Sequence, residues 1–119
     1  MGRIQGDLPD RTFRFVLAVL EIVERLPSNN TGWIVTRQLV RSGTSIGANI
    51  AEADHAHTTT DFAHRCNIAL KEAAEVDYWL RLCRESSLID GDELDTLLRE
   101  CDDIIRILTV SVKRTQSAH

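Results

Sequence analysis

Residues 62–83 read FAHRCNIALKEAAEVDYWLRLC, and their apolar residues follow a regular pattern. Its apolar positions are separated alternately by four and three residues over three heptads: Phe62, Cys66, Ala69, Ala73, Val76, Leu80 and Cys83. This is the a/d spacing of a helix that buries one face against other helices, whereas a strand would repeat every two residues. The stretch therefore predicts a long helix in an all-α protein, with Leu70 and Trp79 widening its apolar face.

The same spacing returns in the last quarter of the chain. The apolar positions there are Leu94, Leu98, Cys101, Ile105, Leu108 and Val112. Leu97 and Ile104 flank this row. Asp90 and Glu93 have the spacing of a capping box, so we expect the helix to begin at this pair.

The first helix carries two apolar rows instead of one. We expect it to be capped by Asp10 and to end near Leu26, because Pro27 cannot continue a helix. One row is Phe13, Val16, Leu20 and Val23, and the other is Phe15, Val19, Ile22 and Leu26. Two rows indicate either a deeply buried helix or a helix with one face toward the bundle and the other toward another subunit.

For the second helix we expect Asn30 or Thr31 as the cap. Its inner row reads Thr36, Leu39, Gly43, Ile46, Ile50 and Ala53. Gly43, Gly47 and Ala51 follow each other at spacing four, and glycine inside a helix costs stability. Because the apolar period continues through them, we expect close packing here and not a break. For the third helix we expect Thr58 or Thr60 as the cap.

Four helices joined by loops near residues 28–31, 55–59 and 87–90 predict an antiparallel up-down-up-down four-helix bundle. With only 6 Gly and 2 Pro, the chain lacks the turns of a β-sandwich or barrel. We expect one domain over residues 1–119, with an ordered core at about 8–114. One of the two rows of the first helix is more than a single core needs, and so are the flanking residues Leu70, Trp79, Leu97 and Ile104. This surplus predicts self-association.

The composition of the chain argues against several classes of protein. The net charge is −4, so the chain lacks the basic footprint of many nucleic-acid-binding proteins. Its apolar runs are too short for a transmembrane helix or a signal peptide, which predicts a cytoplasmic protein. The cysteines number 3, an odd count that predicts free buried thiols.

One group of polar residues is a candidate site. Ser45, Asn49 and Glu52 lie beside the small residues of the second helix, and we expect Glu72 or Lys71 to face them. Such a cluster either fixes the register of the helices or forms a shared polar site at a subunit interface.

Two pairs of arginines are candidate phosphate contacts. Arg37 and Arg41 share one face of the second helix, and Arg81 and Arg84 share a face of the third. The alternative is that these arginines pair with nearby carboxylates on the surface.

Potential metal ligands crowd a short segment: His55, His57, Asp61, His64 and Cys66. The histidine pair falls in a loop and Cys66 belongs to the inner row, so this spacing is not that of a metal site. We expect no metal, no cofactor and no catalytic residues.

Two motifs resemble a known family. They are RSGTSIGANIAEA at residues 41–53 and ALKEAAEVDYWLRL at residues 69–82, and RTFRF at 11–15 with Leu26-Pro27 agrees more weakly. Over about residues 8–112 the chain resembles the bacterial four helix bundle protein family, also called the 23S rRNA intervening-sequence protein family. The resemblance implies a compact antiparallel four-helix bundle and, as in related proteins, a ring-like homopentamer.

One relative in this fold is the accessory variability protein of diversity-generating retroelements, which is strongly basic and works with a reverse transcriptase and nucleic acid. This chain departs from it with its net charge of −4. We therefore expect a non-enzymatic, homo-oligomeric scaffold or accessory protein that acts through protein–protein contacts, with copies of itself and with a possible protein partner. The alternative is a nucleic-acid-binding accessory factor, associated with an rRNA intervening sequence or a retroelement.

Overall fold

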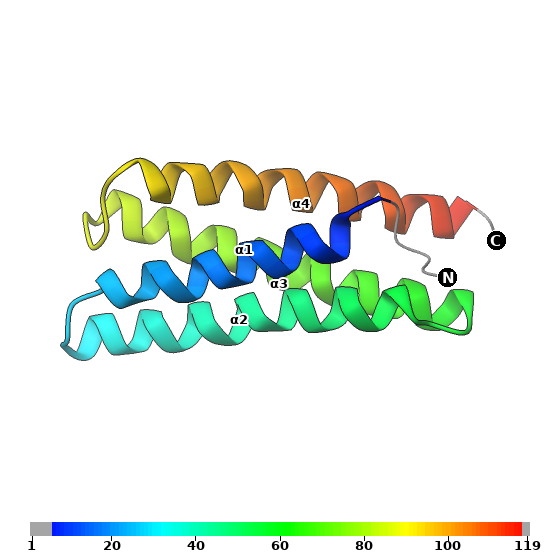
Figure 1. Ribbon diagram of the computed structural model, residues 1–119, viewed down its shortest axis with the longest axis horizontal. Helices are drawn as coiled ribbons and strands as arrows, with labels where there is room; N and C mark the ends of the chain where they lie inside the picture. Colours follow the sequence, from blue (N-terminus) through cyan, green and yellow to red (C-terminus); the bar gives the residue numbers. More distant parts are fainter. Residues whose placement is uncertain (1–5, 118–119) are drawn as a thin grey trace.

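The computed structural model describes residues 6–117. Within them lie the α-helices α1 (Leu8–Ile22), α2 (Asn30–Asp54), α3 (Thr59–Glu85) and α4 (Asp92–Ser117). A short 3-10 helix, η1 (Val23–Arg25), continues α1. Consecutive helices run antiparallel in a rod of 47 × 21 × 20 Å (Figure 1). The predicted all-α, up-down-up-down four-helix bundle is confirmed.

The inner row of α3 forms the centre of the core. All seven of its predicted positions are buried. Because Ala73 is small, α4 comes close enough for the Cys101 thiol to donate a hydrogen bond to the Ala73 carbonyl oxygen, at 3.3 Å. On α4 the inner row differs from the prediction at one place, since Ile104 is fully buried and Ile105 only partly.

The glycines of α2 permit close packing against α1. A Cβ atom on Gly43 would lie 3.3 Å from Cγ1 of Val19, and one on Gly47 would lie 3.2 Å from Cγ2 of Val16. The helix continues through both positions without a break. The expectation of close packing is therefore confirmed.

Helix starts were predicted with mixed success. α1 begins before Asp10, which lies in the first turn and does not cap the helix, so that prediction is wrong. The cap of α2 is Asn29, whose side-chain oxygen accepts from the Gly32 amide at 2.9 Å, in place of the predicted Asn30 or Thr31. Thr58 caps α3, accepting from the Asp61 amide at 3.0 Å, as one of the two predictions had it.

At the start of α4 the predicted capping box is wrong. Gly91, with a φ of +108°, separates Asp90 from the helix, which begins at Asp92. The Glu93 carboxylate pairs instead with Arg25 on η1. At its other end α4 runs past the predicted limit of the ordered core at residue 114. The predicted lead-in falls mostly on residues 1–5, which lie outside the described part.

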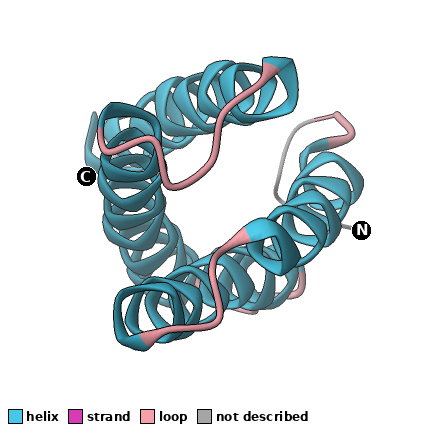
Figure 2. Ribbon diagram, turned by 90° about the vertical axis from the view of Figure 1, so that its left-hand side faces the viewer, coloured by secondary structure: helices cyan, strands magenta, loops and turns pink. Residues whose placement is uncertain are grey.

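The four helices surround one core, but their contacts are unequal (Figure 2). The contact between α2 and α3 is the most extensive of those between neighbouring helices, and that between α1 and α4 is the smallest. Ion pairs hold α1 and α4 together near both ends of α1. Arg11 donates to Glu100 at 2.5 and 2.8 Å and to Asp103 at 3.1 Å, and Arg25 pairs with Glu93.

Among residues 6–117, no helix is long and apolar enough to cross a membrane.

Candidate functional site

An ion cluster centred on Arg41 joins α2 to α3. The Arg41 guanidinium lies 3.2 Å from Oε2 of Glu72 and also pairs with the Glu75 carboxylate. Glu75 Oε1 accepts a second hydrogen bond from Nε1 of Trp79 at 3.2 Å. The cluster therefore combines parts of both family-like motifs in one contact across two helices.

The hydrogen bond from Arg41 holds the pKa of Glu75 below its ordinary value, and the bond from Trp79 acts in the same direction. A carboxyl group with a lowered pKa in the folded state stabilises the protein above its ordinary pKa. That contribution is lost as the pH falls through the lowered value. The pKa of Arg41 is raised in turn, chiefly by its hydrogen bond to Glu75.

Replacing Arg41 by methionine is expected to raise the pKa of Glu75 toward its ordinary value. Methionine keeps an apolar stem and removes the donor that stabilises the carboxylate. The measurement is a titration of the Glu75 carboxyl carbon by NMR. Arg37→Met is the matched control, because Arg37 lies one turn earlier on α2, and it should leave the titration unchanged. An unchanged Glu75 titration in Arg41→Met would contradict the assignment.

A second polar cluster joins the same two helices nearer the α2–α3 loop. Asn49 Nδ2 donates to the Ser45 carbonyl oxygen at 2.9 Å. Arg65 reaches across from α3, 3.4 Å from Oδ1 of Asn49 and 2.9 Å from Oε2 of Glu52. Three of the predicted cluster residues therefore meet, but Glu72 is not among them, since it lies with Arg41.

Arg65 is the residue that sequence reasoning missed at this cluster. The expected partner of this cluster on the third helix was Glu72 or Lys71. The register of the helices explains the difference. Arg41 lies opposite Glu72, so Asn49, two turns further along α2, must lie opposite a residue about two turns earlier on the antiparallel α3. The Arg41–Glu72 pair, once known, would have located Arg65.

The four candidate phosphate contacts are not gathered into one basic surface. Arg41 is held by its two glutamates. Arg81 pairs with Asp77 at 2.9 Å, and Arg84 pairs with Glu85 and Asp95. Only Arg37 of these four has no ion pair with another residue of the 6–117 segment. Most of this positive charge is therefore neutralised locally.

The potential metal ligands near the α2–α3 loop are not assembled either. Cys66 is fully buried in the core. Throughout residues 6–117, no three His, Cys, Asp or Glu side chains lie close enough together to hold a metal ion.

Exposed apolar side chains gather on the outward face of α1 and in the first turn of α2, with Tyr78 and Leu82 on α3 and Val110 on α4 exposed elsewhere. On α1, Phe13 is 63% exposed, Leu17 47% and Leu20 37%. On α2, Trp33 is 59% exposed and Ile34 is similar.

The second row of α1 is buried in the bundle. The other predicted row is divided, because Phe13 and Leu20 are exposed whereas Val16 is partly buried and Val23 is buried. The helix is therefore not buried on all sides, and the contact of its outward face with another subunit stays a prediction.

The predicted surplus elsewhere was wrong in part. Leu97 and Ile104 are buried in the core, and Leu70 and Trp79 are partly buried against it. Trp33 was not predicted as a surface residue. The available signal was its position immediately after a loop and outside the inner row of α2.

An open groove separates α1 from α4 at the end of the bundle where η1 lies. Its cavity volume is about 460 Å³. The apolar lining comes from Ala18, Ile22 and Leu97, and acidic side chains Glu21, Asp92 and Glu93 stand along it with Arg25 and Thr96. We call this the α1–α4 groove. The contact between these helices is the smallest in the bundle, which explains why a groove opens here.

The comparisons with known proteins agree with this architecture. The family described as 23S rRNA-intervening sequence protein matches residues 7–110. A solved structure from Bacteroides thetaiotaomicron, of a protein with unknown function from the S23 ribosomal protein family, is 33% identical in sequence with a TM-score of 0.81. The match covers 89% of this chain and 98% of that one. The comparison with curated proteins gives no match. This chain belongs to the 23S rRNA-intervening sequence protein family.

Proposed function

We propose that this protein is a non-enzymatic, homo-oligomeric scaffold or accessory protein that acts through protein–protein contacts. The observation that carries this is the exposed row of Phe13, Leu17 and Leu20 on α1. Proteins that work as single copies rarely expose large contiguous apolar patches. Since the bundle already has a complete core, these side chains can leave water only against another molecule.

The distribution of the exposed surface supports a ring. A two-fold dimer uses one self-complementary patch, whereas a head-to-tail contact uses two unlike surfaces and forms a ring when the rotation between copies closes. This chain has two unlike surfaces, the apolar side chains on α1 and α2 and the α1–α4 groove. A ring also agrees with the homopentamer that the family resemblance implies. Free buried cysteines support a location in the reducing cytoplasm.

The test is the molar mass of the purified protein at micromolar concentration, measured by sedimentation and light scattering. We expect a discrete oligomer. We expect the triple variant Phe13→Ser, Leu17→Ser, Leu20→Ser to have a smaller mass with an unchanged helical spectrum, because none of these side chains belongs to the buried core.

Val110→Ser is the matched control, because Val110 is 47% exposed on α4, away from the α1 row. It should keep the oligomer intact. A stable wild-type monomer at micromolar concentration would overturn the proposal, as would an unchanged oligomer in the triple variant.

The second candidate is a nucleic-acid-binding accessory factor, and the 23S rRNA intervening sequence in the description of the family is the reason to test it. The local ion pairs of Arg41, Arg81 and Arg84 count against it. Gel shifts with RNA and DNA over a range of salt concentrations distinguish the two, because phosphate contacts weaken steeply with salt. We expect no salt-dependent shift.

A further inference from the structure

We infer that Trp33 and Arg37 of one copy of this chain dock into the α1–α4 groove of the next copy. This inference rests on the proposed oligomer and names the surfaces that build it. The partner copy would supply an aromatic ring, which the groove lacks, and a second cation beside Arg25.

The groove has the chemistry to receive such a pair. Its apolar lining of Ala18, Ile22 and Leu97 suits an aromatic ring. Its acidic side chains outnumber its single arginine, Arg25, which already pairs with Glu93. Glu21 has no ion pair with any other residue among those described. A cation brought by a partner therefore finds an available carboxylate beside the apolar lining.

The first turns of α2 carry the complementary chemistry. Trp33 and Arg37 are four residues apart and therefore project from the same face of the helix. Trp33 is 59% exposed, and Arg37 is exposed without an ion pair in the described chain. Tryptophan and arginine are among the residue types enriched at the energetic centres of protein interfaces. Opposite charges at the contact add specificity.

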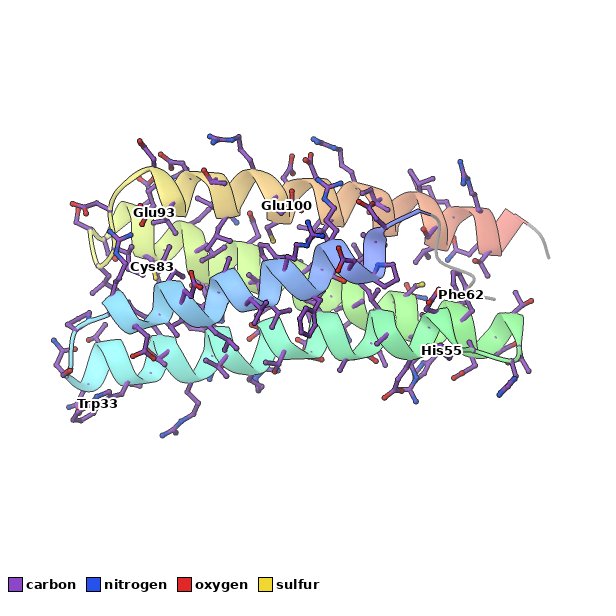
Figure 3. The ribbon with its side chains drawn as sticks, in the orientation of Figure 1. Trp33, His55, Phe62, Cys83, Glu93 and Glu100 are labelled. Atoms are coloured by element: carbon purple, nitrogen blue, oxygen red, sulfur yellow. The ribbon has the colours of Figure 1, made fainter. Side chains whose placement is uncertain are left out.

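The two surfaces also lie at the same height along the bundle. Trp33 is in the first turn of α2 and Glu93 in the first turn of α4, both at the end of the molecule where η1 lies (Figure 3). In a ring of parallel subunits, the two halves of a head-to-tail contact must match in height. This pair of surfaces satisfies that requirement.

The exposed row of α1 lies between the two surfaces. Val16 faces Gly47 of α2, while Ala18 lines the groove toward α4, so Leu17 lies between these two directions. Docking along the groove would therefore cover part of the α1 row as well. The same contact would therefore remove Trp33 and part of the α1 row from water.

Exchange of charges tests the contact directly. Arg37→Glu alone and Glu21→Arg alone should each weaken assembly about tenfold or more, because each places like charges together. The double variant should restore it. Glu24→Arg is the control, since Glu24 is exposed on η1 one turn from Glu21 but does not line the groove, and it should leave assembly unchanged.

Cross-linking gives an independent measurement on the full chain. Arg37→Cys protein mixed with Glu21→Cys protein should form a disulfide-linked dimer on oxidation, and a mixture of Arg37→Cys with Glu24→Cys should not. A wild-type monomer would overturn the proposed oligomer itself. An intact wild-type oligomer with neither cross-link nor charge-exchange rescue would overturn this docking alone.

Discussion

Replacing Gly32 by alanine is expected to lower the stability of the fold by about 3 kcal/mol. A Cβ atom at this position would lie 1.7 Å from the carbonyl oxygen of Pro27, a backbone atom that cannot move without shifting the α1–α2 loop. Forced overpacking costs about 1–3 kcal/mol. The shift would also disturb the Asn29 cap, which accepts from the Gly32 amide, and a lost cap costs about 1 kcal/mol.

The measurement is thermal unfolding followed by circular dichroism, with an expected fall in Tm of roughly 10–15 °C. Gly47→Ala is the matched control on the same helix. Its Cβ would meet only Cγ2 of Val16, a partly exposed side chain that can turn aside, and alanine favours a helix by about 1 kcal/mol over glycine. We expect Gly47→Ala to be nearly neutral. Equal Tm values for the two variants would refute the steric argument.

Alkaline pH is expected to destabilise the protein through its three buried thiols. Burial raises the pKa of Cys66 to about 11 and that of Cys101 to about 12, and it raises the pKa of Cys83 as well. The unfolded chain releases these protons near pH 9, whereas the folded chain keeps them. Stability is therefore fully present below pH 9 and falls as the pH rises toward the folded pKa values, by about 2 kcal/mol at pH 10.5 for each of Cys66 and Cys101.

Urea unfolding between pH 7.5 and 10.5 measures this loss. The variant with Cys66, Cys83 and Cys101 all replaced by alanine serves as the comparison. It starts from a lower stability because of the small cavities, but its stability should decline less with pH. Identical declines in the two proteins would show that the thiols do not contribute.

The inner face of α3 could be predicted from the sequence because its spacing is unambiguous. Seven apolar positions at alternating steps admit one helical face, and all seven are buried. On α2 it was harder to predict which of two adjacent residues is buried. Val35 is buried where Thr36 was expected, because the face toward α1 and the face toward the core are only one residue apart on the helix.

The contacts between helices could not be predicted in the same way. A periodic row of apolar residues indicates which side of a helix is buried. It does not indicate the axial register of that helix against its neighbour. Arg65 was therefore missed as the partner of Asn49, and Glu93 was assigned to a cap although it pairs with Arg25. The α1–α4 groove was equally invisible, since it depends on how closely the first and last helices approach.

The unequal contacts of the four helices bear on the order in which the chain folds. Contacts between elements adjacent in sequence form early, because little chain entropy is lost in closing a short loop. The α2–α3 hairpin has both a short loop and the most extensive contact, so it is favoured as the first part to form. The α1–α4 contact joins opposite ends of the chain and is the smallest. We therefore expect closure of the bundle to be the last step of folding, with the smallest gain in contacts. A neighbouring copy bound in the groove would add contacts where the single chain has fewest.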